Sequence, residues 1–118
     1  MILADTSVWI DHLRHGNRQL SDSLRADEIL SHPFVMGELV CGGFPGRDAL
    51  LRDLGRLPAA VVARHEEALQ LLESHRLWGT GLGWIDVHLL ASALLTGCRL
   101  WTLDHRLASA AGKSGVKL

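Results

Sequence analysis

The sequence predicts an α/β fold: a parallel sheet of four to five strands with helices on both faces, in a single domain over residues 1–118. Short apolar runs alternate with helical patterns along the whole chain, which is typical of parallel sheets with crossover helices. No repeat or linker divides the sequence. A chain of 118 residues is one domain with a real core, although it is close to the minimum for five strands.

The N-terminal part predicts two strands separated by two helices. Met1 to Ala4 form an apolar run that ends at Asp5, and Thr6 or Ser7 can cap the helix that follows. That helix ends at Gly16. A short helix comes next, with Leu20 and Leu24 four residues apart, and residues 28–31 predict a brief second strand.

The middle of the chain predicts two helices and a third strand. A helix begins after His32 and ends at Gly42, and on it Glu38 falls among apolar residues rather than on a polar face. A lone carboxylate in an apolar helix needs a reason. Residues 49–54 predict another helix, and the β-branched run 59–63 predicts the third strand.

The C-terminal part carries the most apolar helix. An amphipathic helix over 64–77 leads to the glycine-rich loop 79–83, which lacks the lysine of a P-loop and is interpreted as a hinge. A buried helix then starts near Asp86 and stops at Gly97, and the apolar fourth strand after it ends at Asp104. A helix over 105–111 and an edge strand over 116–118 complete the expected strand order 3-2-1-4-5.

Acidic side chains stand where the first and fourth strands end. Ligands bind at the carboxyl ends of strands in open α/β sheets, so Asp5 and Asp104 are expected at one edge, with Asp86 nearby on the buried helix. Two unit charges about 4 Å apart repel by roughly 4 kcal/mol at an effective dielectric near 20. Convergence of these carboxylates therefore predicts a cation between them.

Composition excludes few classes of function. The formal net charge of −1 does not indicate a polyanion as partner, although it permits a local phosphate-binding patch. Cys41 and Cys98 form no metal or redox motif, no signal-peptide pattern opens the chain, and no apolar run reaches about 18 residues. We expect a cytoplasmic protein with no membrane contact.

With the acidic residues identified, the whole chain resembles the PIN-domain ribonucleases, and among them the VapC-type toxins of toxin–antitoxin modules. The features that carry this resemblance are Ile2-Leu3-Ala4-Asp5-Thr6-Ser7, Gly37-Glu38-Leu39, Trp84-Ile85-Asp86-Val87-His88-Leu89-Leu90-Ala91 and Leu100-Trp101-Thr102-Leu103-Asp104. The resemblance implies a three-layer α/β/α fold that binds Mg²⁺ or Mn²⁺ and cuts RNA. It also implies a homodimer and inhibition by a cognate antitoxin protein.

The resemblance assigns the catalytic and metal-binding roles to Asp5, Glu38, Asp86 and Asp104. We expect Asp5 and Asp86 to be direct metal ligands, Asp104 to be a ligand or an outer carboxylate, and Glu38 to orient water or complete the ligand set. The hydroxyls expected to support these carboxylates belong to Thr6, Ser7 and Thr102. The candidates for RNA phosphate contacts are Arg14, Arg18, His105 and Arg106.

Simpler interpretations stay open at this point. Asp5, Asp86 and Asp104 can each be a helix N-cap, which requires no shared location. His12, His15 and His88 lack the full ligand set of a zinc site and are expected on an exposed face or packed. Trp9, Trp84 and Trp101 are expected in the core, with Trp78 less so.

Three other classes of function compete with a nuclease. A Mg²⁺-binding receiver domain needs an acidic pair after the first strand and an aspartate after the third, but this chain has Asp5-Thr6-Ser7 and Ala63-Arg64 there. A phosphatase with an aspartyl nucleophile needs a second acid two residues after the first. A non-catalytic protein-binding module of the same fold also remains possible on fold grounds.

Overall fold

The computed structural model describes all residues from 1 to 118 and centres on a parallel sheet of three short strands. Strand β1 (Ile2–Ala4) lies between β2 (Ile29–Leu30) and β3 (Arg99–Trp101). Leu3 pairs with Leu30 on one side and with Leu100 on the other. The α/β class and the placement of the first strand beside the strand at 99–101 are therefore confirmed.

The two outermost predicted strands, at 59–63 and 116–118, are absent as strands. Each contributes one isolated parallel bridge, Ser31 with Ala59 and Leu100 with Lys117. Beyond Ala59, the backbone N–H groups of residues 61 and 63 donate to hydroxyls of a helix, at 2.9 Å and 3.1 Å, rather than to a neighbouring strand. The sheet thus has three strands instead of four or five, and the bridges extend it by single residues.

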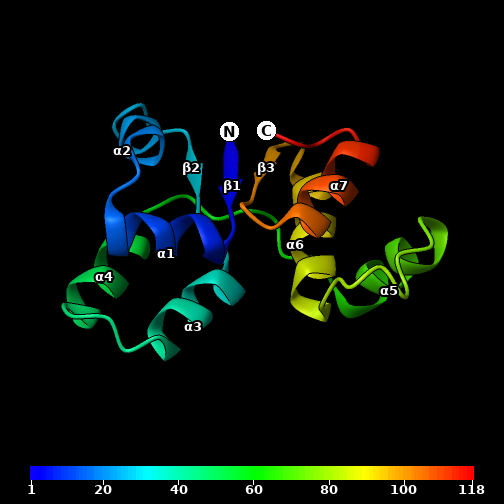
Figure 1. The fold of residues 1–118 in the computed structure, drawn as a ribbon, viewed down its shortest axis with the longest axis horizontal. Coiled ribbons are helices and arrows are strands. Elements are labelled where there is room, and N and C mark those ends of the chain that lie inside the picture. Colours follow the sequence, from blue (N-terminus) through cyan, green and yellow to red (C-terminus); the bar gives the residue numbers. More distant parts are fainter.

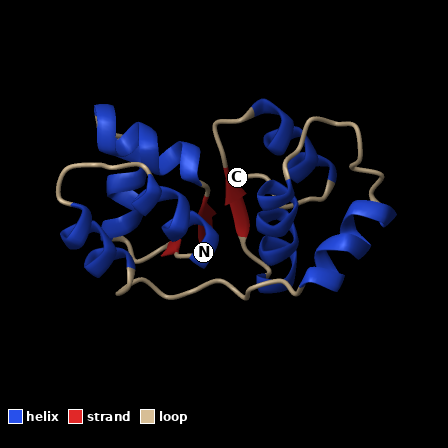
Figure 2. Ribbon diagram, turned by 90° about the horizontal axis from the view of Figure 1, so that it is seen from below, coloured by secondary structure: helices blue, strands red, loops and turns tan.

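The chain forms seven helices around the sheet. Figure 1 shows how they are arranged. Figures 1 and 2 both place the strands between a group made of α1 to α4 and a group made of α5 to α7. The first group comprises α1 (Thr6–His15), α2 (Arg18–Arg25), α3 (Pro33–Cys41) and α4 (Arg47–Leu54). The second comprises α5 (His65–Ser74), α6 (Trp84–Thr96) and α7 (His105–Lys113).

Helix α6 is the central helix of the second group. Every residue from Val87 to Ala93 is buried, as its apolar sequence predicts, and the helix ends at Gly97 in the left-handed conformation (φ 72°). With 13 residues it is the longest helix, and none of the seven has the length and hydropathy that a membrane span requires.

The tryptophans divide between core and surface. Trp9 and Trp101 are buried as expected, but the prediction for Trp84 is wrong, because 39% of this residue is exposed. Trp84 stands in the first turn of α6, where its ring meets the rings of His65 and His88 edge-on. Trp78 is also exposed.

A buried polar link joins α3 to α6 across the molecule. His32 is fully buried and caps α3, with its Nδ1 accepting from the Phe34 backbone N–H at 3.1 Å. Because Nδ1 is an acceptor, Nε2 carries the hydrogen and donates to Ser92 Oγ on α6, 3.0 Å away. Burial, and then the nearby charge of His88, lowers the pKa of His32 to about 4. The link fixes α3, which carries Glu38, against α6, which carries Asp86.

Candidate functional site

The four predicted carboxylates line one pocket, which we call the acidic pocket. It has a volume of about 260 Å³ and receives side chains from α1, α3, α6 and the residues that end β1 and precede α7. Its lining residues are Asp5, Thr6, Ser7, Ile10, Glu38, Asp86, Leu89 and Asp104. Side chains from position 5 to position 104 of the chain thus meet beside the carboxyl ends of β1 and β3.

Asp5 is the deepest of the four, with 5% of the residue exposed. It follows β1 and caps α1, where Oδ1 accepts from the Val8 backbone N–H at 3.3 Å. Two hydroxyls also donate to it at 2.5 Å, Ser7 Oγ to Oδ1 and Thr102 Oγ1 to Oδ2. These hydrogen bonds fix the orientation of the carboxylate on the rigid end of the sheet.

Asp86 lies in the first turn of α6 and is half-buried. Its Oδ2 accepts from the backbone N–H of Gly83 at 3.1 Å. Burial raises the pKa of the Asp86 carboxyl, and the negative charges of Asp104 and Asp5 raise it further, while the Gly83 hydrogen bond opposes them. The charges of three carboxylates therefore act on one another in this pocket.

Glu38 and Asp104 stand at the exposed rim. The hydroxyl of Thr6 donates to Glu38 Oε1 at 3.0 Å. Asp104 Oδ1 caps α7 by accepting from the backbone N–H groups of Arg106 at 2.8 Å and Leu107 at 3.2 Å. Asp5 and Asp104 are thus N-caps and pocket residues at once, so capping does not compete with a shared site.

No basic side chain neutralises these carboxylates. The ion pairs of the protein join Arg25, Arg47, Arg56 and Arg64 to other acids, namely Asp22, Asp48, Asp53 and Glu67. As the side chains stand, no three of them are close enough to hold one metal ion. Hard, unpaired carboxylate oxygens are nevertheless the ligands that Mg²⁺ and Mn²⁺ prefer, so the residues present fit such an ion.

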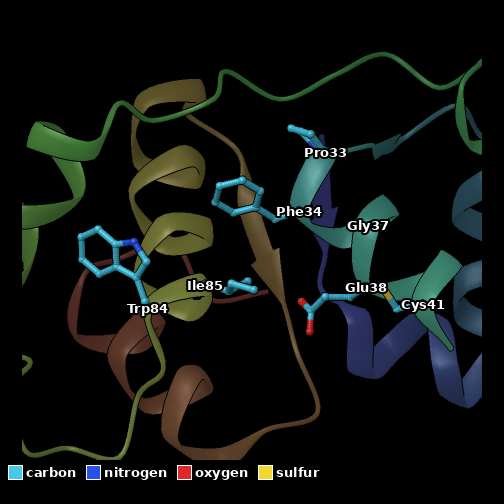
Figure 3. A pocket seen from close by; sticks show the side chains of 7 residues that line it. All are labelled: Pro33, Phe34, Gly37, Glu38, Cys41, Trp84 and Ile85. Atoms are coloured by element: carbon cyan, nitrogen blue, oxygen red, sulfur yellow. The ribbon is translucent and has the colours of Figure 1, made fainter.

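A larger apolar pocket of about 520 Å³ adjoins the acidic pocket and shares Glu38 with it. Figure 3 shows Phe34 and Glu38 of α3 on one side of this space and Ile85 of α6 pointing towards them, with the Trp84 ring at the far edge. Pro33, Gly37 and Cys41 complete the lining. An apolar surface therefore leads directly to one of the four carboxylates.

The candidate phosphate-contacting residues fall into two places. Arg14 lies over the ring of Phe44, 5.9 Å from its centroid, and Arg18 is exposed on α2, so neither lines the acidic pocket. His105 and Arg106 directly follow Asp104 and line a separate pocket of about 410 Å³, which we call the basic cleft. Its lining residues are His75, Arg76, Leu77, Thr80, His105, Arg106, Ser109, Ala110 and Lys113.

Two structural features, one in the core behind the site and one on the surface beside it, escaped prediction from sequence. Ser92 lies in an apolar run on α6. No local pattern reveals that its Oγ accepts hydrogen bonds from both His32 Nε2 and the backbone N–H of Ala63. Arg76 and Lys113 are exposed basic residues, which are common on any surface. Only the proximity of residue 76 to residues 106 and 113 in the folded chain makes them noticeable.

Comparison with known proteins shows which family the chain resembles. The family model described as PIN domain matches residues 2–113. Two relatives named Ribonuclease VapC32, from Mycobacterium tuberculosis strains CDC 1551 / Oshkosh and ATCC 25618 / H37Rv, are each 49% identical over 119 residues. Each alignment covers 100% of this chain and 96% of the relative.

Proposed function

This chain belongs to the PIN-domain family, as a VapC-type ribonuclease, and from that premise we propose that its acidic pocket binds Mg²⁺ or Mn²⁺ and hydrolyses phosphodiester bonds of RNA. The observation that carries the proposal is the meeting of Asp5, Glu38, Asp86 and Asp104 in one pocket without a basic partner. Four carboxylates without a counterion favour a divalent cation.

The protein's own residues divide the work by their burial. Asp5 and Asp86, which are fixed by hydrogen bonds at the sheet and at α6, hold the ion. Asp104 completes the ligand set, directly or through a water, from the rim. Glu38, exposed and held by one hydroxyl, orients the attacking water. When bound, the ion offsets charge on the phosphodiester and lowers the pKa of water, so no protein nucleophile is required.

The hydroxyls of Thr6, Ser7 and Thr102 position these carboxylates. Each donates to an acidic oxygen of the pocket, which leaves the remaining lone pairs for the ion. Loss of such an outer partner typically costs 10- to 100-fold, roughly, in metal affinity or activity.

The proposal includes protein partners, in keeping with a toxin of a toxin–antitoxin module acting in the cytoplasm. The apolar pocket beside Glu38 suits an apolar segment of a cognate antitoxin, which would cover the acidic pocket as it binds. Homodimer formation is supported by exposed apolar side chains away from that pocket, among them Val61, Val62, Leu94 and Leu95. Light scattering of the purified chain tests the dimer.

Cleavage of RNA with and without divalent cation tests the function. We expect cleavage in Mg²⁺ or Mn²⁺, none in chelator, and a loss on the order of 10²-fold or more for Asp5→Asn and for Asp86→Asn. The matched control is Glu73→Gln, an exposed acid of α5 outside the acidic pocket. Unchanged cleavage by both aspartate variants would refute the proposal.

A further inference from the structure

The basic cleft concentrates positive charge beside the acidic pocket. Arg76, two residues after α5, lines it together with Arg106 and Lys113 of α7 and the imidazoles of His75 and His105. No acidic side chain is among the lining residues. The whole chain has a net charge of −1, so this concentration is local and does not reflect the composition.

The basic side chains of the cleft have no acidic partner within the protein. Arg76, Arg106 and Lys113 take part in no ion pair, whereas four other arginines do. Surface cations that converge on a concave site without carboxylate partners are the usual electrostatic footprint of a phosphate-binding surface. The cleft therefore presents cationic hydrogen-bond donors that can bind an anion, and no acidic side chain of the protein pairs with them.

The glycine-rich loop 79–83 connects the cleft to the acidic pocket. Gly81, at φ +87°, approaches Arg106 so closely that a Cβ at residue 81 would lie 2.8 Å from Arg106 Cδ and 2.9 Å from its Nε. Two residues later, the Gly83 N–H donates to Asp86. One loop thus contacts a cation of the cleft and a carboxylate of the pocket, and Arg106 is itself two residues beyond Asp104.

We propose that the basic cleft binds the phosphates of the RNA strand next to the bond that the acidic pocket cuts. This inference rests on the proposed function, and it names the subsite that holds the substrate in place. The cleft meets the backbone of the strand, so it orients the RNA without reading its bases. Arg14 and Arg18, on the other helical group, are outside this path.

Binding of a labelled single-stranded oligouridylate to the full chain in chelator tests the inference without cleavage. We expect the double variant Arg76→Gln/Arg106→Gln to bind on the order of tenfold more weakly, with a salt slope reduced by roughly 0.7 for each phosphate that is no longer neutralised. The matched control, Arg52→Gln/Arg56→Gln, removes the same charge from exposed positions in and after α4. It should bind like the wild type.

Three results would overturn the inference. The first is unchanged oligouridylate binding by the cleft variant, and the second is an equal loss of binding in the control variant. The third is competition by a polyglutamate peptide as strong as that by unlabelled oligouridylate, which would indicate a site for acidic peptides instead. Circular dichroism and thermal unfolding establish that both variants fold. Because binding is measured in chelator, a failure here is separable from a failure of metal-dependent cleavage.

Discussion

Thr102, one residue after β3, donates its hydroxyl hydrogen to Asp5 Oδ2, one residue after β1, at 2.5 Å. The same oxygen of Thr102 accepts from the backbone N–H of Asp104 at 3.0 Å. A single hydroxyl therefore bridges the ends of two neighbouring strands, and it joins the Asp5 carboxylate to the backbone of Asp104. The arrangement depends on the parallel pairing of β1 with β3, which brings positions 5 and 102 together.

Removal of this hydroxyl should weaken catalysis more than folding. We expect Thr102→Val, which keeps the shape of the side chain, to lower kcat by roughly 10- to 100-fold, because Asp5 loses a partner that orients it. Thr102→Ser keeps the hydroxyl and should retain most of the activity. The control Thr96→Val removes a hydroxyl that accepts from the Val61 N–H outside the pocket, and it should leave kcat unchanged. Wild-type kcat in Thr102→Val would contradict this role.

The buried His32 predicts a loss of stability in acid. Its pKa is near 6.5 in the unfolded chain and about 4 in the folded protein, so only the unfolded chain takes up the proton between these values. The contribution of neutral His32 to the stability of the folded protein is therefore fully present above pH 6.5. As the pH falls from there towards 4, the free energy of unfolding decreases by up to about 1.4 kcal/mol per pH unit.

His32→Asn isolates this contribution. Asparagine still caps α3 but does not titrate, so the free energy of unfolding should depend less steeply on pH across this range. His88, whose pKa is also lowered by burial, retains a part of the slope. Urea unfolding at a series of pH values measures it, and an identical slope in His32→Asn and wild type would show that His32 does not cause the acid sensitivity.

Gly81→Ala tests the close approach of the loop to Arg106. The new Cβ would displace Arg106, so we expect weaker binding of oligouridylate in chelator, together with a stability loss of about 1 kcal/mol for a non-glycine residue at positive φ. Gly79→Ala is the matched control, because Gly79 also has positive φ (71°) but has open space around its Cβ position. It should lose similar stability and keep RNA binding. Equal binding by both variants would show that the position of Arg106 beside the loop does not matter for RNA binding.

The sequence predicted the centre of the fold better than its edges. Residues 2–4 before Asp5 are apolar and buried, and so are Leu100 and Trp101 of β3, although the strand ends at Trp101 and Leu103 is exposed. A carboxylate that follows a buried strand lies at the rim of the sheet, so the convergence of the acids follows from strand geometry. The edge at 59–63 failed as a strand because hydroxyls of Thr96 and Ser92 take its N–H groups. β-Branched composition does not reveal such side-chain partners.

The surfaces around the acidic pocket were less accessible to prediction. Trp84 has the large apolar side chain that is typical of a core residue, but its place in the first turn of α6 leaves it at the wall of the apolar pocket. The basic cleft joins residues 75–80 to residues 105–113, and only the packing of the folded chain brings them together. Local patterns contain no signal for either.

Calorimetric titration of Mn²⁺ into the protein without RNA tests most directly whether the carboxylates share one cation. Wild-type protein and the control Glu73→Gln should bind Mn²⁺ with the same affinity. Asp86→Asn should bind it at least roughly tenfold more weakly, because it removes one of the two proposed direct ligands from the acidic pocket. Equal affinity of Asp86→Asn and wild type for Mn²⁺, or no binding by either, would contradict the account.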